Sequence, residues 1–170
     1  MAKVIALAKT NFLQLEIALP ALAVTIPFFI SGPQWLTGTM VNTFLFLFIS
    51  KLPLRKSIPI IVLPSIAALA HGVVFGPLTP FLFYFLPFIW LGNLLMISLF
   101  SAFKKRNYLF AVGLASIGKF VLLMSMAFLY FNLKIVPQSF ITSMGLIQLT
   151  TAFSGGLLSF GILGFVKKQS

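Results

Sequence analysis

Long apolar stretches follow one another along this chain, and short clusters of basic residues or Gly-Pro turns separate them. By residue number the stretches are about 12–30, 35–52, 58–75, 80–103, 108–131 and 140–166. Each is close to the ~20 residues that a helix needs to cross a bilayer. None alternates polar and apolar residues as a barrel strand does. The pattern predicts an all-α integral membrane bundle of six transmembrane helices, in a single membrane domain that covers residues 1–170.

The composition supports a membrane location. Hydrophobic residues make up 60% of the 170 residues and charged residues 8%, and the mean hydropathy is +1.12. A soluble domain carries roughly 25% charged residues. A chain with so few charges cannot cover a fold of this size with polar surface, so we expect the lipid bilayer to be its main surroundings.

The basic residues predict the orientation, because cytoplasmic loops collect Lys and Arg. If the N-terminus is inside, all of the 12 Lys and Arg residues except Lys119 and Lys134 lie on the cytoplasmic side. We therefore expect both termini inside (N-in/C-in). The net charge of +11 is spread over several helix ends, so it does not indicate a nucleic-acid partner.

Few residues are available for catalysis. Glu16 is the only acidic residue, His71 is the only histidine, and the chain has no cysteine. Acid–base pairs, thiolate sites and histidine metal sites all need more such groups. The chain also lacks the Gly-rich phosphate loop of an ATPase. We expect no enzyme activity, no cofactor and no metal.

The N-terminal stretch has an alternative interpretation as a signal peptide. Basic residues, an apolar run and the sequence Ala21–Leu22–Ala23 resemble a cleavable signal, and cleavage would leave five helices. Glu16 interrupts the apolar run, which then continues to Ile30, and both features favour an uncleaved first helix.

Lys119 is the most informative polar residue, because it lies near the middle of the stretch 108–131. A Lys at this depth costs about 2.5–3.5 kcal/mol on insertion scales. It therefore needs a partner or a water-filled cavity. The partner is either an anionic group of a substrate or the carboxylate of Glu16. The alternative is a Lys whose long side chain reaches the interface. Glu16 itself is either an interfacial residue, a brace for Lys119 or a proton-coupled carboxylate.

Other polar residues gather toward the predicted outer side. Gln34, Trp35, Thr37 and Asn42 suit the rim of a small-molecule pocket, or an interfacial belt anchored by the tryptophan. Each of the remaining polar residues at membrane depth is explained by packing between helices, but together they suit one cavity. The expected substrate-binding residues are Gln34, Trp35, Thr37, Asn42, His71, Asn93, Lys119 and Gln148.

Small residues recur at helical spacing in the last apolar stretch. Such a stripe allows another helix to approach closely, either within the bundle or from a partner protein. Its members are Gly145, Ala152, Gly155, Gly156 and Ser159.

Three segments carry a resemblance to a known family. They are 34–42 (QWLTGTMVN), 63–65 (LPS) and 87–93 (PFIWLGN). With these segments and the six-span layout, the chain resembles the S components, the substrate-binding membrane subunits of energy-coupling factor (ECF) transporters. The resemblance implies a multi-pass protein of the bacterial inner membrane that captures a micronutrient at its outer face. It implies association with a transmembrane coupling protein and cytoplasmic ATPases, and release of the substrate by toppling in the membrane.

The first helix departs from that family. S components usually present an Ala-x-x-x-Ala surface to the coupling protein. Ala18, Ala21 and Ala23 do not give this spacing within the membrane, and Ala2 and Ala6 lie at the extreme end of the helix. Two other functions therefore stay open. A self-sufficient secondary carrier would use Glu16, Lys119 or His71 as its titratable group. A structural or assembly subunit would use the amides and small residues only for packing.

Overall fold

The computed structural model describes residues 2–29, 33–72 and 76–169, with side chains described for 14–29, 33–72 and 76–168. In these ranges every regular element is a helix, so the all-α prediction is confirmed. The α-helices are α1 (Ala2–Phe29), α2 (Gln34–Lys51), α3 (Ile58–His71), α4 (Leu82–Phe103), α5 (Tyr108–Asn132), α6 (Ser139–Met144) and α7 (Leu146–Gln169). Short 3-10 helices, η1 (Leu54–Lys56) and η2 (Gly76–Phe81), precede α3 and α4.

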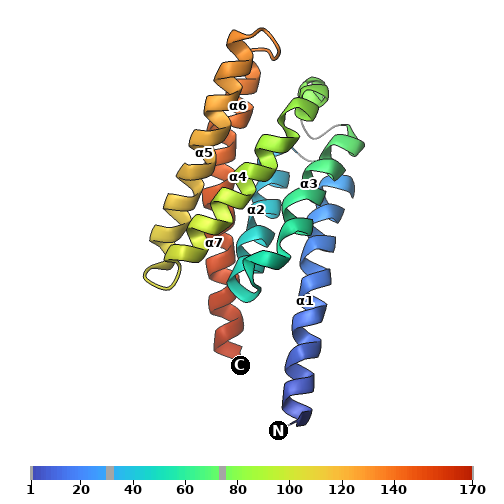
Figure 1. Cartoon of the computed structure of the whole chain (residues 1–170), viewed down its shortest axis with the longest axis vertical. Helices are drawn as coiled ribbons and strands as arrows, with labels where there is room; N and C mark the ends of the chain where they lie inside the picture. Colours follow the sequence, from blue (N-terminus) through green and yellow to red (C-terminus); the bar gives the residue numbers. More distant parts are fainter. Residues whose placement is uncertain (1, 30–32, 73–75, 170) are drawn as a thin grey trace.

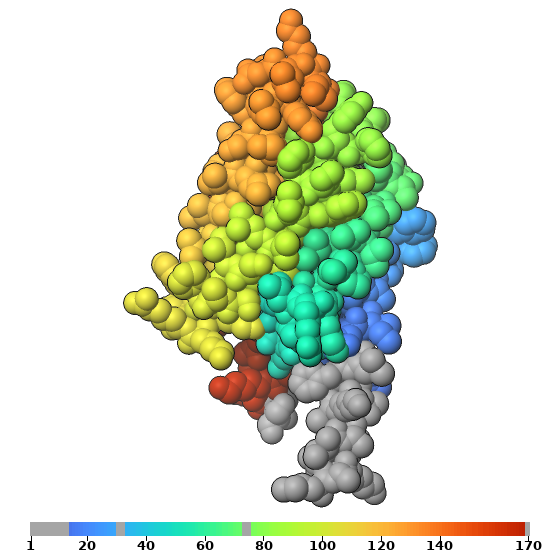
Figure 2. Space-filling view, in the orientation of Figure 1, coloured from blue at the N-terminus to red at the C-terminus, as the bar shows by residue number. Residues whose placement is uncertain are grey.

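Four helical segments of the described chain are long and apolar enough to cross a membrane. They are Leu54–His71, Gly76–Phe103, Tyr108–Asn132 and Ser139–Lys168. Large apolar side chains are exposed along them, and Figure 2 shows the face that α3, α4 and α5 form together. This surface suits contact with lipid tails, so the chain is a membrane protein; the full set of six spans stays a prediction.

Helix α2 is not among these four segments, although it is long enough. It contacts α1, α3, α4 and α7, and it lies behind α3 and α4 in the view of Figure 1. Many of its side chains are buried against protein, including Thr37, Asn42 and Thr43. A helix enclosed by other helices has little lipid to face, and it can therefore carry more polar residues than its neighbours.

The last predicted span, 140–166, is divided. Gly145 separates α6 from α7 with φ −95° and ψ −100°. A Cβ atom at Gly145 would lie 2.4 Å from Met124 Sδ and 2.7 Å from the carbonyl oxygen of Ile141. Only a glycine fits this break, because any side chain would collide with α5 or with the preceding turn.

The two ends of the bundle differ in charge. Both termini, the turn between α2 and α3 and the turn between α4 and α5 lie at one end, and the turn between α5 and α6 lies at the other (Figure 1). We call the first the basic end. It carries Lys51, Arg55, Lys56, Lys104, Lys105, Arg106, Lys167 and Lys168. Lys134 lies at the opposite end.

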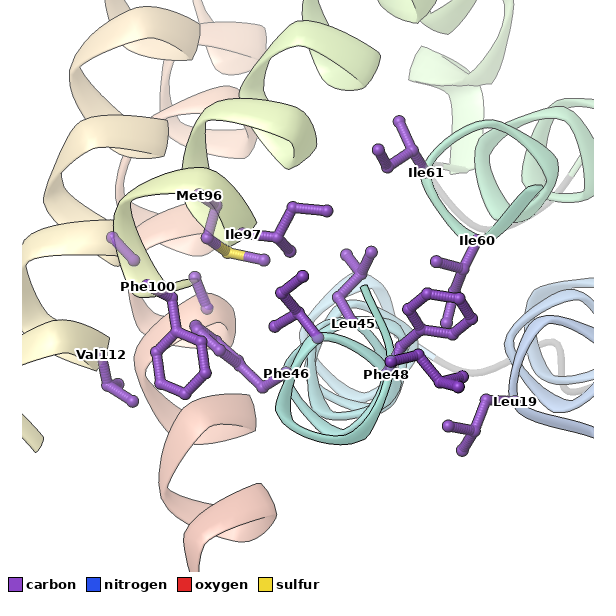
Figure 3. Packing of buried hydrophobic residues seen from close by; sticks show 14 of the residues in the cluster. Leu19, Leu45, Phe46, Phe48, Ile60, Ile61, Met96, Ile97, Phe100 and Val112 are labelled. Atoms are coloured by element: carbon purple, nitrogen blue, oxygen red, sulfur yellow. The ribbon is translucent and has the colours of Figure 1, made fainter. Parts of the chain in front are cut away.

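Two hydrophobic clusters hold the helices together. The larger one surrounds the second half of α2 in the basic half of the bundle, where Phe46 meets Phe100 with ring centroids 4.9 Å apart (Figure 3). Ala23 of α1 is fully buried in this cluster. The other cluster joins α4, α5 and α6 near the opposite end, and Phe85 and Phe140 are among its members. Polar side chains lie between the two clusters.

The small-residue stripe of α7 packs inside the bundle. A Cβ atom on Gly155 would lie 2.8 Å from Asn42 Cβ, and one on Gly156 would lie 2.3 Å from Val112 Cγ1. Ser159 is buried and accepts a hydrogen bond of 2.9 Å from the Tyr108 hydroxyl. The stripe thus brings α7 against α2 and α5. Of the two uses that the sequence left open, packing within the bundle is the one that the structure shows.

Candidate functional site

A cavity of about 70 Å³ lies among α1, α2, α3, α4, α5 and α7. We call it the central cavity. Its lining residues are Pro27, Gln34, Thr37, Gly38, Val41, Asn42, Pro64, Ser65, Ala68, Leu82, Ile89, Asn93, Lys119 and Gln148. Gln34 and Gln148 begin α2 and α7 at the end away from the basic end, whereas Asn42, Asn93 and Lys119 lie near the middle of their helices. The cavity therefore extends from the middle of the bundle toward the end opposite the basic end.

The structure brings together most of the predicted binding residues. Those that line the central cavity are Gln34, Thr37, Asn42, Asn93, Lys119 and Gln148. They come from α2, α4, α5 and α7, and they share only the property of being polar within apolar stretches. Their role in binding a substrate stays a prediction.

Trp35 and His71 do not line the central cavity, and their role in binding a substrate likewise stays a prediction. Trp35 follows Gln34, so its side chain is rotated by about 100° around α2, and it is 59% exposed. His71 lies one turn beyond Ala68, at the last residue of α3, where its ring meets Phe28 edge-to-face with centroids 6.4 Å apart.

Lys119 is 3% exposed and is held in place by an amide. Its Nζ donates a hydrogen bond of 2.8 Å to Asn42 Oδ1. Asn42 Nδ2 donates to Thr151 Oγ1 at 3.3 Å, and the Thr151 hydroxyl donates to the carbonyl oxygen of Gln148 at 3.2 Å. The amide nitrogen of Asn42 is thus bonded to Thr151 of α7, and the amide oxygen of Asn42 faces the ammonium group of Lys119.

The suggested ion pair between Glu16 and Lys119 is wrong. Glu16 forms a salt bridge with Lys56, which precedes α3, because α1 packs along α3. Glu16 is the only acidic side chain of the sequence. The partner of Lys119 in the described part of the chain is therefore a neutral amide, and no carboxylate side chain remains to balance its charge.

Two further polar atoms of cavity residues have no hydrogen-bond partner among the described residues. They are Thr37 Oγ1 and Asn93 Oδ1, and each side chain is 3% exposed. The amide nitrogen of Asn93 donates to the carbonyl oxygen of Ile61 at 3.2 Å, which leaves the oxygen for another group. A buried polar atom without a partner costs about 1–3 kcal/mol, so these atoms weaken the fold unless a ligand or water binds them.

Close helix packing shapes the cavity. A Cβ atom on Gly38 would lie 3.1 Å from Thr151 Cγ2, and one on Gly92 would lie 3.4 Å from Lys119 Cγ. The first distance is tighter than an ordinary contact, so Gly38 lets α2 and α7 approach closely beside Thr151, whereas the second is an ordinary van der Waals contact.

Ser65 and Thr151 were not among the expected substrate-binding residues. Ser65 lines the cavity, accepts a hydrogen bond of 2.8 Å from Trp90 Nε1 and donates to the carbonyl oxygen of Val62 at 2.9 Å. Thr151 supports Asn42. A helical signal was present for Thr151, because it lies three residues after Gln148 and so shares its helix face. Ser65 offered no such signal beyond its place in the segment 63–65.

The cavity combines an ammonium group, a hydroxyl and amides with apolar walls. Its volume is small beside the roughly 300–1,000 Å³ of typical ligand pockets, and it has room for a few water molecules or for a ligand of few heavy atoms. In the described ranges no three His, Cys, Asp or Glu side chains gather, so no metal site is indicated there. No protein-family model, no characterised protein and no solved structure matches this chain.

Proposed function

We propose that the chain is the substrate-specific membrane subunit, or S component, of an ECF-type importer. It binds a small micronutrient at the outer face of a bacterial inner membrane and passes it to a separate ATP-driven module. The observation that carries this proposal is the central cavity, where polar side chains of several helices surround the buried Lys119.

The orientation of the cavity supports capture from outside. Basic residues of membrane proteins collect on the cytoplasmic side, and here they lie at the end of the bundle that holds both termini. With the basic end in the cytoplasm and six spans, the polar starts of α2 and α7 face outward. The central cavity then lies between the outer surface and the middle of the membrane.

The energy for uptake would come from partner proteins that hydrolyse ATP. The sequence has no phosphate-binding loop with its Lys and Ser/Thr, so an ATP-driven importer built on this chain would need separate ATPases and a transmembrane coupling protein. Helix α1 exposes Ala18 and Ala21 on its surface. These small side chains allow close approach of a partner helix, although they lack the Ala-x-x-x-Ala spacing of the family that the chain resembles.

A proton-coupled carrier is less well supported. Such a carrier would use Glu16, Lys119 or His71 as its titratable group. Glu16 is bonded to Lys56, and neither Glu16 nor His71 is part of the cavity lining, which leaves Lys119 alone for this role. A purely structural subunit is also less well supported, because it does not explain why Thr37 Oγ1 and Asn93 Oδ1 are buried without a partner among the described residues.

Gentle purification of the tagged chain from its native membrane tests the proposal. Mass spectrometry of the co-purified material should find a transmembrane coupling protein, ATPases and a small molecule. Lys134→Met is a suitable control and should co-purify with the same material as the wild type, because Lys134 is exposed and lies away from both the cavity and the basic end. Recovery without ATPases, together with uptake that survives ATP depletion but stops with a proton uncoupler, would replace the importer by a secondary carrier.

A further inference from the structure

We infer that the central cavity binds a small carboxylate that also carries a hydroxyl or amino group, with Lys119 as the counter-ion of the carboxylate. This inference rests on the proposed function in one respect: it takes the cavity to be the ligand site.

The charge balance of the chain is the first reason. Lys119 is 3% exposed, and the only acidic side chain, Glu16, is bonded to Lys56. A buried ammonium group is unfavourable unless it is paired with an anion or solvated. This chain has no further carboxylate side chain to pair with it, so a ligand is the source of the opposite charge.

The geometry of the Lys119 ammonium group is the second reason. An ammonium group has three N–H donors, and one of them binds Asn42 Oδ1 at 2.8 Å. Asn42 cannot rotate freely, because its Nδ2 is bonded to Thr151. Lys119 is thus held on one side and keeps two donors, which suit the oxygens of a carboxylate.

The unpartnered atoms narrow the ligand class. Thr37 has a hydroxyl, which donates to an anion or accepts from a donor. The amide nitrogen of Asn93 already donates to Ile61, so the atom without a partner among the described residues is the amide oxygen. An amide oxygen can only accept a hydrogen bond. A ligand that satisfies Asn93 therefore presents an O–H or N–H group, and the cavity volume of about 70 Å³ limits it to few heavy atoms.

The first test uses the purified full chain in mild detergent and measures its thermal unfolding midpoint. Sodium glycolate should raise the midpoint more than sodium chloride at equal ionic strength. Sodium acetate, which lacks the hydroxyl, should raise it less, and neutral ethylene glycol should leave it unchanged. Lys119→Met should weaken glycolate binding at least about tenfold, whereas the exposed-lysine variant Lys105→Met should bind like the wild type.

A second variant gives an independent result. Asn42→Asp places a carboxylate beside Lys119 without changing the size of the side chain. It should raise the midpoint in the absence of added anion and abolish the glycolate effect, because the internal carboxylate occupies the ammonium group. A glycolate effect as large in Asn42→Asp as in the wild type would contradict the inference, because the ammonium group of Lys119 would then already be paired with the introduced carboxylate and could not be the glycolate site.

The inference is overturned if glycolate and chloride act equally on the wild type, or if Lys119→Met keeps the glycolate effect. A neutral compound that co-purifies equally with the wild type and with Lys119→Met would also overturn it. Failure of the proposed function looks different: glycolate binding would persist, but ATPases would not co-purify.

Discussion

Helix α2 passes through two environments, and its halves differ in chemistry although both carry buried side chains. The first half, 34–42, contributes Gln34, Thr37 and Asn42 to the central cavity. The second half, 43–51, contributes Phe46 and other apolar side chains to the larger hydrophobic cluster. The polar half leaves a buried hydroxyl without a partner among the described residues, whereas the apolar half buries Phe46, Phe48 and Ile49 against other apolar side chains.

We expect this difference to separate stability from ligand binding along one helix. Apolar side chains in a filled core hold the helices together, and their loss leaves a cavity. Buried polar groups add little net stability, and unpaired ones reduce it. We therefore expect substitutions in the second half of α2 to affect folding, and those in the first half to affect ligand binding.

The largest effect should come from Phe46→Ala. Phe46 is fully buried and packs on Phe100. Its truncation should lower the free energy of unfolding by about 3–5 kcal/mol, measured by denaturant titration in mild detergent. The control is Phe128→Ala, whose side chain is exposed and should matter little. A loss below about 1 kcal/mol for Phe46→Ala would show that the cluster repacks.

An intermediate effect should come from adding one methyl group to α7. Gly156→Ala places a Cβ atom 2.3 Å from Val112 Cγ1, and such overpacking costs about 1–3 kcal/mol. The double variant with Val112→Ala should recover part of this loss in the same unfolding assay. Gly161→Ala is the matched control, because nothing lies within 4 Å of its Cβ position. Equal behaviour of the two glycine variants would contradict the close contact.

A smaller effect on stability, with a clear effect on binding, is expected for Thr37→Val. The change removes a buried hydroxyl without a partner among the described residues, so the free energy of unfolding should stay constant or rise by about 1 kcal/mol. Ligand affinity in an uptake or binding assay should fall about tenfold. Thr39→Val is the control, because its hydroxyl bonds to the carbonyl oxygen of Trp35 on the same helix. Destabilisation by Thr37→Val would mean that the hydroxyl supports the fold.

The smallest effect concerns the only acidic residue. In double-mutant cycles of unfolding, Glu16→Gln and Lys56→Met should show a coupling of about 0.2–1 kcal/mol, as for an exposed ion pair. Glu16→Gln and Lys119→Met should be additive within about 0.5 kcal/mol, because Glu16 is bonded to Lys56 and not to Lys119. Mutual rescue of Glu16 and Lys119 variants would restore the pairing that the structure contradicts.

Part of the candidate site was predictable from single residues. Gln34, Thr37, Asn42, Asn93, Lys119 and Gln148 stood out as polar groups in apolar helices, and polar groups in such helices turn toward other protein. Trp35 and His71 were selected by the same reasoning but are placed elsewhere, because one step around a helix or one turn along it moves a side chain out of a cavity. The close contact of Gly145 with Met124 joins two distant segments, which no local pattern reveals.

The amino-acid sequence by itself determined the helical class and the membrane location, because both depend on the summed apolar character of long segments. It also determined that Lys119 has at most one possible carboxylate side chain as a partner, since only Glu16 is acidic. Only the tertiary structure decided that Glu16 bonds to Lys56, that Asn42 holds Lys119 and that the stripe of α7 packs within the bundle. The physical reason is range: apolar transfer adds up residue by residue, whereas hydrogen bonds and ion pairs require atoms from distant segments within about 3–4 Å.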